Sequence, residues 1–281
     1  MRKNKNSKIV GFIFLLVLGV MWTVPLMFGV LTSFKPNKEI ASLGGFRLLP
    51  VDWTISQYIN TFTGTANFPI VRWFMNSIII SFSHMVLMVL VVSLAAYGYT
   101  RIEFKGRDKM FFVLLCISMF PQVVNIIPTY KIVDSFGWVN TFMAVIVPGL
   151  GGVTNIFLVR QFMLGIPKEY DESAKIDGAS DLYIYAKVII PLVKPILTVV
   201  ALFSFTASWN DFLWPTIVFT DVNKMPITAG LQLLQGTYWT YQYLGQMMAA
   251  ATFAILPTFV IFLFTQKHFL ESMSLGSGVK G

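Results

Sequence analysis

The sequence is poor in charge and in cysteine, and each shortage excludes a class of protein. Only 12% of its 281 residues are charged, against 56% that are hydrophobic, whereas soluble domains carry about 25% charged residues. A soluble globular fold is therefore excluded, and we expect a chain that crosses a membrane several times. The single cysteine, Cys116, lies in an apolar run, so no disulfide framework or cysteine metal cluster is possible and a packing role is expected.

Patterns of catalytic or metal-binding residues are also missing from the sequence. The two histidines, His84 and His268, lie far apart and show no ligand or catalytic spacing, which argues against a metal site. No G-x-x-x-x-G-K-[ST] phosphate loop occurs, and the glycine cluster at 149–152 is followed by Val-Thr-Asn without the lysine. We therefore expect no enzyme activity, no metal and no cofactor in this chain, and any ATP must be bound by a partner.

Six long apolar runs account for most of the chain. The first follows a basic start and exceeds the apolar core of about 7–15 residues found in signal peptides, so we interpret it as a retained helix. The runs predict one all-α transmembrane domain over residues 1–281, with six membrane-spanning helices at about 9–33, 75–99, 110–130, 139–159, 189–218 and 244–266. Prolines inside the runs, together with the glycines at 149–152, are expected to break or kink helices; these prolines are Pro25, Pro121, Pro148, Pro215 and Pro257.

The basic residues give this arrangement an orientation. With the N-terminus inside, fifteen of the 21 Lys and Arg residues fall on the inner side and six on the outer side. Basic residues resist translocation, so both termini are expected in the cytoplasm of a multi-pass protein of the cell membrane. The formal charge of +8 is spread over the ends of apolar runs rather than gathered in one patch, which speaks against nucleic-acid binding.

Residues 165–190 form the most polar stretch between two apolar runs, and the orientation places them in the cytoplasm. Acidic residues cluster where a first short helix would begin, as the helix dipole favours. Asp177-Gly178 should end that helix because glycine takes the left-handed conformation, and Ser180 should cap a second one. We predict a helix-bend-helix with two apolar faces, formed by Ile166, Tyr170 and Ala174 and by Leu182, Tyr185, Ala186 and Ile189.

Three short motifs make the chain resemble a known family. Glu172-Ser173-Ala174, Asp177-Gly178-Ala179 and Ile190-Pro191 are similar in type and spacing to the cytoplasmic EAA loop of binding-protein-dependent ABC importer permeases, more narrowly those of the maltose type, and the likeness extends over nearly the whole chain. The resemblance implies the type I ABC importer permease fold, with residues 165–190 as a coupling helix docked on an ATPase. The coupling residues it implies are Glu169, Glu172, Ser173, Ala174, Asp177, Gly178, Ala179 and Pro191. The alternative is a solvated interfacial loop without a partner.

The same resemblance implies a function and a set of partners. The chain would be the permease subunit of an ATP-driven carbohydrate importer, with an oligosaccharide as substrate. Its partners would be a second homologous permease, an ATPase dimer and an extracytoplasmic sugar-binding protein. An ion-driven secondary transporter is the alternative, which the near absence of intramembrane acids opposes. A scaffold that recruits a partner without transport is a further alternative.

Two regions are candidates for contact with substrate or binding protein. Asp211 is the one acid inside an apolar run, and its setting SWNDFLWP resembles a path-lining helix of sugar permeases, which makes Trp209, Asn210 and Asp211 candidates for the translocation path. A polar pair that fixes helix packing would also explain them. In the aromatic outer loop at 220–245, the resemblance suggests contact with the binding protein through Gln232, Tyr238 and Trp239. An interfacial aromatic belt is the alternative there.

Overall fold

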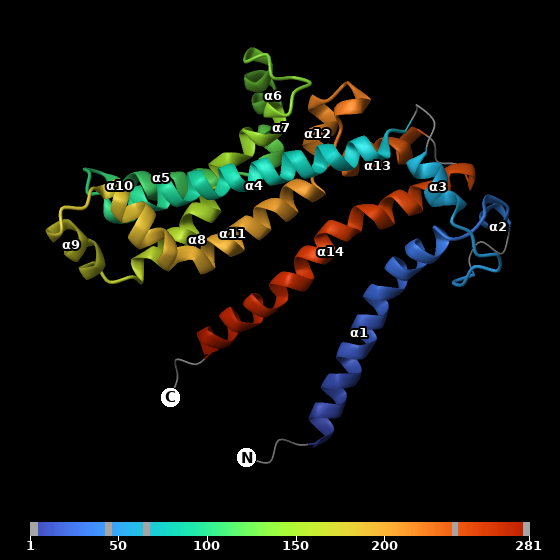
Figure 1. The fold of residues 1–281 in the computed structure, drawn as a ribbon, viewed down its shortest axis with the longest axis horizontal. Helices are drawn as coiled ribbons and strands as arrows, with labels where there is room; N and C mark the ends of the chain where they lie inside the picture. Colours follow the sequence, from blue (N-terminus) through green and yellow to red (C-terminus); the bar gives the residue numbers. More distant parts are fainter. Residues whose placement is uncertain (1–4, 43–46, 64–67, 238–240, 278–281) are drawn as a thin grey trace. The chain divides into compact units, whose positions relative to one another are not determined.

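A computed structural model describes residues 5–42, 47–63, 68–237 and 241–277, and within these ranges the chain is helical and contains no β-strand (Figure 1). The all-α prediction is confirmed for this part of the chain. The chain divides into two compact units, one formed by Met1–Val71 with Gly230–Gly281 and the other by Arg72–Ala229.

The first unit contains two long helices and two short ones. These are α1 (Lys5–Thr32), α2 (Asn37–Ala41), α3 (Ser56–Phe62) and α14 (Tyr241–Ser277), and α14 contacts the other three. The backbone of α14 lies close to α3 at Gly245, where an added Cβ would lie 2.5 Å from Nε2 of Gln57. The apolar side chains of α1 are exposed along most of its length, as expected of a helix whose surroundings are lipid or another subunit.

The second unit is a layer of long helices with shorter ones at its two ends (Figure 1). The long helix α4 (Ile70–Arg101) packs with α8 and α11, and residues such as Val92, Val159 and Val193 are fully buried between them. The helices that follow α4 in this unit are α5 (Arg107–Ser118), α6 (Ile126–Ser135), α7 (Met143–Ile146), α8 (Val153–Leu164), α9 (Glu169–Ile176), α10 (Asp181–Tyr183), α11 (Ile190–Asn210) and α12 (Leu213–Val218). Helix α13 (Ile227–Thr237) begins in this unit, and most of its residues belong to the first.

Polar side chains at the start of α4 are satisfied by the backbone that precedes α13. Nε1 of Trp73 donates to the carbonyl of Val222 at 2.6 Å, and Nδ2 of Asn76 donates to that of Met225 at 3.0 Å. The Ile227 N–H donates to a serine hydroxyl on α4 at 2.7 Å. Because buried polar groups are costly without partners, these bonds fix the loop between α12 and α13 against α4.

Among the described residues, four helical segments are long and apolar enough to cross a membrane, and two bent helix pairs bring the total to as many as six. The four are Ile9–Thr32, Ile70–Arg101, Asp181–Asn210 and Tyr243–Leu263, and the pairs are Arg107–Ser118 with Gln122–Ser135 and Met143–Gly151 with Val153–Leu164.

The two pairs bend by 90° and 46°. The first break contains Pro121 and the second Gly152, so the prediction of broken helices is confirmed at both places. Pro25 and Pro257, by contrast, lie inside the continuous helices α1 and α14. Proline lacks the N–H that continues a helix, and it disfavours the helical conformation of the residue before it. The run at 110–130 is therefore not one straight helix, because it turns through a right angle after Ser118.

The prediction that Asp211 lies inside a helix is wrong. Helix α11 ends at Asn210, and Asp211 follows in an extended conformation with φ −70° and ψ 128° before α12 begins at Leu213. Its side chain accepts from the Trp214 N–H at 3.4 Å, and its own carbonyl accepts from the hydroxyl of Thr228 at 2.7 Å. Local hydrogen bonds to these polar groups therefore replace the backbone hydrogen bonds that would continue the helix at this position.

Candidate functional site

The bend in segment 165–190 is built by a Schellman motif at the end of α9. The Gly178 N–H donates to the Lys175 carbonyl at 3.0 Å, and the Ala179 N–H donates to the Ala174 carbonyl at 2.9 Å. Gly178 has φ +81°, a left-handed conformation that favours glycine. The predicted role of Gly178 as a helix terminator is thus confirmed. Ala174 and Ala179 both pack against the hydrophobic core of this unit, which explains why small apolar residues occupy these two motif positions.

The second half of the segment begins as predicted and then departs from the α-helix. Oγ of Ser180 accepts from the Tyr183 N–H at 3.3 Å, which confirms the predicted cap. A π-helical turn at Ile184–Ile189 then leads into α11, where Pro191 is exposed in the first turn. Because the π-turn is continuous with α11, this proline lies within a helical run, directly after a residue whose N–H donates back to the Tyr185 carbonyl.

The apolar face predicted for this second half is partly wrong. Tyr185 and Ile189 are buried, but Ile184 is buried beside them, while Leu182 is 70% exposed and Ala186 is also exposed. A π-turn closes i→i+5 hydrogen bonds, so the spacing of an α-helix does not hold across it. The first half shows a similar difference, because Tyr170 is exposed while Ile166 and Ala174 face the core.

A buried ion pair fastens α9 to the end of α4. Nε of Arg101 lies 3.0 Å from Oδ2 of Asp171, and their side chains are only 6% and 13% exposed. Nη2 of Arg101 also donates to the Ile166 carbonyl at 2.9 Å. The second oxygen of Asp171, Oδ1, is buried without a hydrogen-bond partner. Sequence reasoning placed Asp171 at a helix start but could not identify its partner.

Two tyrosines add further ties between the segment and α4. Oη of Tyr97 donates to the Asp181 carbonyl at 3.1 Å, and Oη of Tyr185 lies 2.8 Å from Oγ of Ser93. The tyrosine rings pack edge to face with centroids 5.4 Å apart. Buried bonds of this kind resist separation of the elements that they join. Motion of the segment would therefore be transmitted to α4.

Burial raises the pKa of Asp171, while the charge of Arg101 opposes this shift. Because the folded-state pKa lies above its unfolded value, the contribution to stability is present at low pH and is lost as pH rises through the folded-state pKa. We expect amide exchange in α9, corrected for the intrinsic rate, to be slower below the folded-state pKa of Asp171 than above it. Asp171→Asn should remove this dependence, whereas Asp177→Asn, at an exposed carboxylate, should keep it. An unchanged pH dependence in Asp171→Asn would contradict the assignment.

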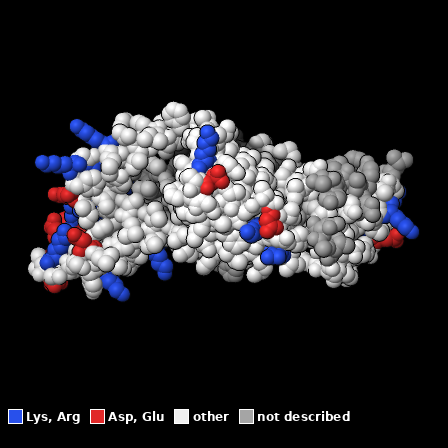
Figure 2. Space-filling model, turned by 90° about the horizontal axis from the view of Figure 1, so that it is seen from above, with Lys and Arg blue, Asp and Glu red and all other residues white. Residues whose placement is uncertain are grey.

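The outer face of the segment exposes large apolar side chains among acids. Tyr170, Ile176 and Leu182 are 52%, 86% and 70% exposed. Glu169 and Glu172 are also exposed, and they line a pocket with the end of α4. In Figure 2, charged side chains gather at the end of the second unit that carries α9 and α10. Exposed apolar residues clustered within a polar surface are typical of a protein interaction site.

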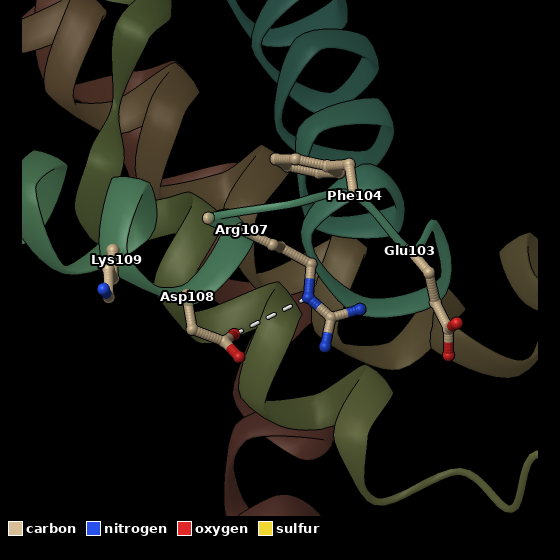
Figure 3. A pocket seen from close by; sticks show the side chains of 6 residues that line it. Glu103, Phe104, Arg107, Asp108 and Lys109 are labelled. Atoms are coloured by element: carbon tan, nitrogen blue, oxygen red, sulfur yellow. Dashed lines mark ion pairs between the residues drawn. The ribbon is translucent and has the colours of Figure 1, made fainter.

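The loop between α4 and α5 forms a pocket of about 410 Å³ close to this end of the unit (Figure 3). Gly106 turns the chain with φ +84°, and Oδ1 of Asp108 then lies 3.6 Å from Nε of Arg107 and 2.8 Å from Nη2 of Arg160. Asp108 thus joins the start of α5 to α8. Its side chain is 69% exposed, so this link contributes little to stability. It lies on the inner side of the predicted topology.

A second cavity, of about 630 Å³, lies where the bent helix pairs meet the end of α11. The predicted path residues Asn210 and Asp211 line it. Trp209 does not, because it is 1% exposed and packs between the rings of Phe205 and Phe74, at centroid distances of 5.7 and 5.5 Å. The cavity also includes His84, which sequence reasoning missed because a lone histidine in an apolar helix carries no motif.

The remaining predicted contacts lie on or beyond α13. Gln232 is exposed on that helix, whereas Tyr238 and Trp239 lie outside the described residues, as does the side chain of His268. Within the described part of the chain, no group of three or more His, Cys, Asp or Glu residues is placed to hold a metal ion.

Comparisons with known proteins identify the family. Residues 5–274 match the family described as binding-protein-dependent transport system inner membrane component. The arabinooligosaccharides transport system permease protein AraQ of Halalkalibacterium halodurans is 32% identical over 287 residues, covering 99% of this chain and 100% of that protein. The maltodextrin transport system permease protein MdxG of Bacillus subtilis is 32% identical over 278 residues, covering 98% and 97%.

A solved structure has the same fold. The crystal structure of a bacterial ABC transporter involved in the import of the acidic polysaccharide alginate contains a chain that aligns with a TM-score of 0.83 and 21% identity, covering 96% of this chain and 98% of that chain. This likeness confirms the predicted fold class. The chain belongs to the family of inner-membrane permease components of binding-protein-dependent ABC transport systems.

Proposed function

We propose that the chain is the permease subunit of an ATP-driven importer for an oligosaccharide. A second homologous permease would complete the path, an extracytoplasmic binding protein would deliver the sugar, and an ATPase dimer would dock on segment 165–190. Both termini would lie in the cytoplasm.

The observation that carries this proposal is the construction of segment 165–190. Its outer face exposes Ile176 and Leu182, while its inner face is held to α4 by the buried pair of Arg101 and Asp171. A partner bound to the outer face would thus move α4 and, through the π-turn, α11. Closure of an ATPase dimer could in this way bias the permease between two states, because rigid helices transmit displacement between bistable packings.

Two observations support a saccharide as the substrate. The relatives named above transport arabinooligosaccharides and maltodextrin according to their names, and a galactooligosaccharides permease, GanQ of Bacillus subtilis, is 30% identical over 278 residues. The cavity beside Asp211 is lined by amides, hydroxyls and an indole. Such groups suit a ligand rich in hydroxyls.

The distribution of basic residues supports the orientation with both termini inside. Within the first unit, α1 runs toward α2 and α14 runs away from it, so the start of α1 and the end of α14 both lie at the ends remote from α2 and α3 (Figure 1). A chain with an even number of spans would likewise have both of its ends on the same side of the membrane.

Purification of the tagged chain in a mild detergent tests the assembly. We expect a second multispanning permease and an ATPase to co-purify and to be identified by mass spectrometry. Glu172→Lys reverses a charge on the outer face of the segment, and it should reduce the recovered ATPase by about tenfold or more, as loss of an interfacial charge pair does. Glu103→Lys, at an exposed glutamate of the other inner loop, is the matched control. Recovery without a second permease or an ATPase would refute the proposed assembly.

A further inference from the structure

Four separate parts of the second unit surround the cavity beside Asp211. His84 comes from α4, a second group follows the right-angle break at Pro121, a third lies in α7 and the turn after it, and a fourth lies at the end of α11 and just beyond it. The volume of about 630 Å³ is within the range of about 300–1,000 Å³ found for small-molecule sites. The polar residues that line it are His84, Gln122, Asn125, Thr129, Ser208, Asn210, Asp211 and Trp214.

Several of these side chains have hydrogen-bonding atoms to spare. Nδ1 of His84 lies 2.9 Å from the Ile146 carbonyl. A carbonyl only accepts, so Nδ1 carries the proton, and Nε2 is an acceptor when the ring is neutral. Nδ2 of Asn210 donates to the Thr206 carbonyl at 2.9 Å, which leaves its Oδ1 as a further acceptor. The Asp211 carboxylate accepts a long bond of 3.4 Å from the Trp214 N–H and also interacts with the Leu213 N–H, which leaves part of its accepting capacity for a ligand.

A close approach of backbone and ring keeps His84 in place. An added Cβ at Gly149 would lie 2.7 Å from Cε1 of the imidazole, so any other residue at this position would force the ring to move. Nε1 of Trp214 donates to the Ala144 carbonyl at 2.8 Å and holds the indole. The polar lining is thereby fixed before a ligand arrives, which lowers the entropic cost of binding.

The charge of the lining limits the chemistry of the ligand. Asp211 is the carboxylate of the cavity, and the residues that line it include no lysine or arginine. An acidic ligand would face this carboxylate without a lysine or arginine in the lining to offset it, which is unfavourable in a partly buried site. The hydroxyls of an uncharged sugar could instead donate to His84, Asn210 and Asp211 and accept from the amides of Gln122 and Asn125.

From this geometry we infer that the cavity is a subsite for an uncharged sugar residue within this subunit, and that Asp211 discriminates against acidic saccharides. The inference rests on the proposed function, because a sugar must enter the permease to occupy the site. Under this inference the present subunit holds a sugar, the cavity residues bind that sugar, and the cavity admits uncharged saccharides.

Protection of a single cysteine tests this inference in the complete importer with its partners, reconstituted in nanodiscs. In a Cys116→Ser background, Thr129→Cys places a thiol in the cavity, and Ser135→Cys places one on an exposed part of the same helix, α6. The labelling rate with a neutral maleimide is measured during ATP turnover with maltotriose, arabinotriose, galactotriose or trigalacturonate. The neutral trisaccharide that stimulates ATP hydrolysis should slow labelling of residue 129 about tenfold at about ten times its dissociation constant. Trigalacturonate should have no effect, and labelling at residue 135 should stay constant.

Two variants separate the contribution of Asp211 from that of cavity shape. Asp211→Asn keeps the size of the side chain and removes its charge, so trigalacturonate should now protect residue 129 as well. Gly149→Ala should displace His84 and weaken protection by the neutral sugar about tenfold, as expected for the loss of one or two hydrogen bonds. If trigalacturonate still fails to protect residue 129 in Asp211→Asn, the discriminating role of Asp211 is overturned.

The outcomes distinguish failure of the subsite from failure of the proposed function. If a neutral sugar stimulates ATP hydrolysis but residue 129 labels at the same rate with and without it, the subsite is refuted and the importer assignment stands. If no saccharide stimulates ATP hydrolysis by the assembled complex, the proposed carbohydrate import is wrong and the subsite inference fails with it.

Discussion

Gly178→Val is expected to leave the membrane helices folded while it abolishes coupling to the ATPase. Gly178 has φ +81°, and a β-branched residue is a genuine outlier in that region. The strain of about 1–2 kcal/mol would be relieved by opening the Schellman motif, which would misalign α9 with the residues after Ser180. No atom lies within 4 Å of an added Cβ, so backbone conformation alone causes the effect. Substrate-stimulated ATP hydrolysis and uptake in proteoliposomes are the measurements.

A second left-handed glycine provides the control for this variant. Gly106 has φ +84° and equally open surroundings, but it lies in the loop between α4 and α5. Gly106→Val should therefore strain the backbone to the same degree while substrate-stimulated ATP hydrolysis continues. Gly178→Asn should be milder than Gly178→Val, because asparagine tolerates the left-handed region better. Normal coupling in Gly178→Val, or an equal loss in Gly106→Val, would contradict a specific role for the bend.

Arg101→Ala is expected to release α9 from α4. The change leaves the Asp171 carboxylate buried without its counter-charge and removes the bond to the Ile166 carbonyl. Breaking a buried pair by removing one partner costs about 3–5 kcal/mol, which is enough to detach a short helix. Hydrogen exchange of residues 166–176 should become fast, and ATP hydrolysis should no longer respond to substrate.

A double-mutant cycle isolates the ion pair from other effects of Arg101. Arg101→Ala with Asp171→Ala removes both charges, so hydrogen exchange in α9 should become slower than in Arg101→Ala alone. Lys175→Ala is the matched control, because its pair with Asp181 is 58% and 55% exposed and should contribute about 0–1 kcal/mol. Additive effects of the two alanine substitutions in the cycle would show that the pair does not fasten the segment.

The features that the sequence determined by itself are those set by neighbouring residues. Membrane-spanning character follows from long apolar runs, and the break at Pro121 follows from a missing donor. The end of α9 at Gly178 and the cap at Ser180 follow from bonds that close within five residues. Such contacts depend on local backbone chemistry, so a pattern in the sequence is enough to predict them.

Tertiary structure alone decided the features that depend on distant partners. It paired Asp171 with Arg101, and through a π-turn it changed which side chains after Ser180 are buried. It also buried Trp209 between aromatic rings while it placed Asp211, two residues further on, beside His84 in a cavity. Neighbouring residues carry no information about which distant side chain will lie opposite them, because helix packing sets those contacts after the local structure has formed.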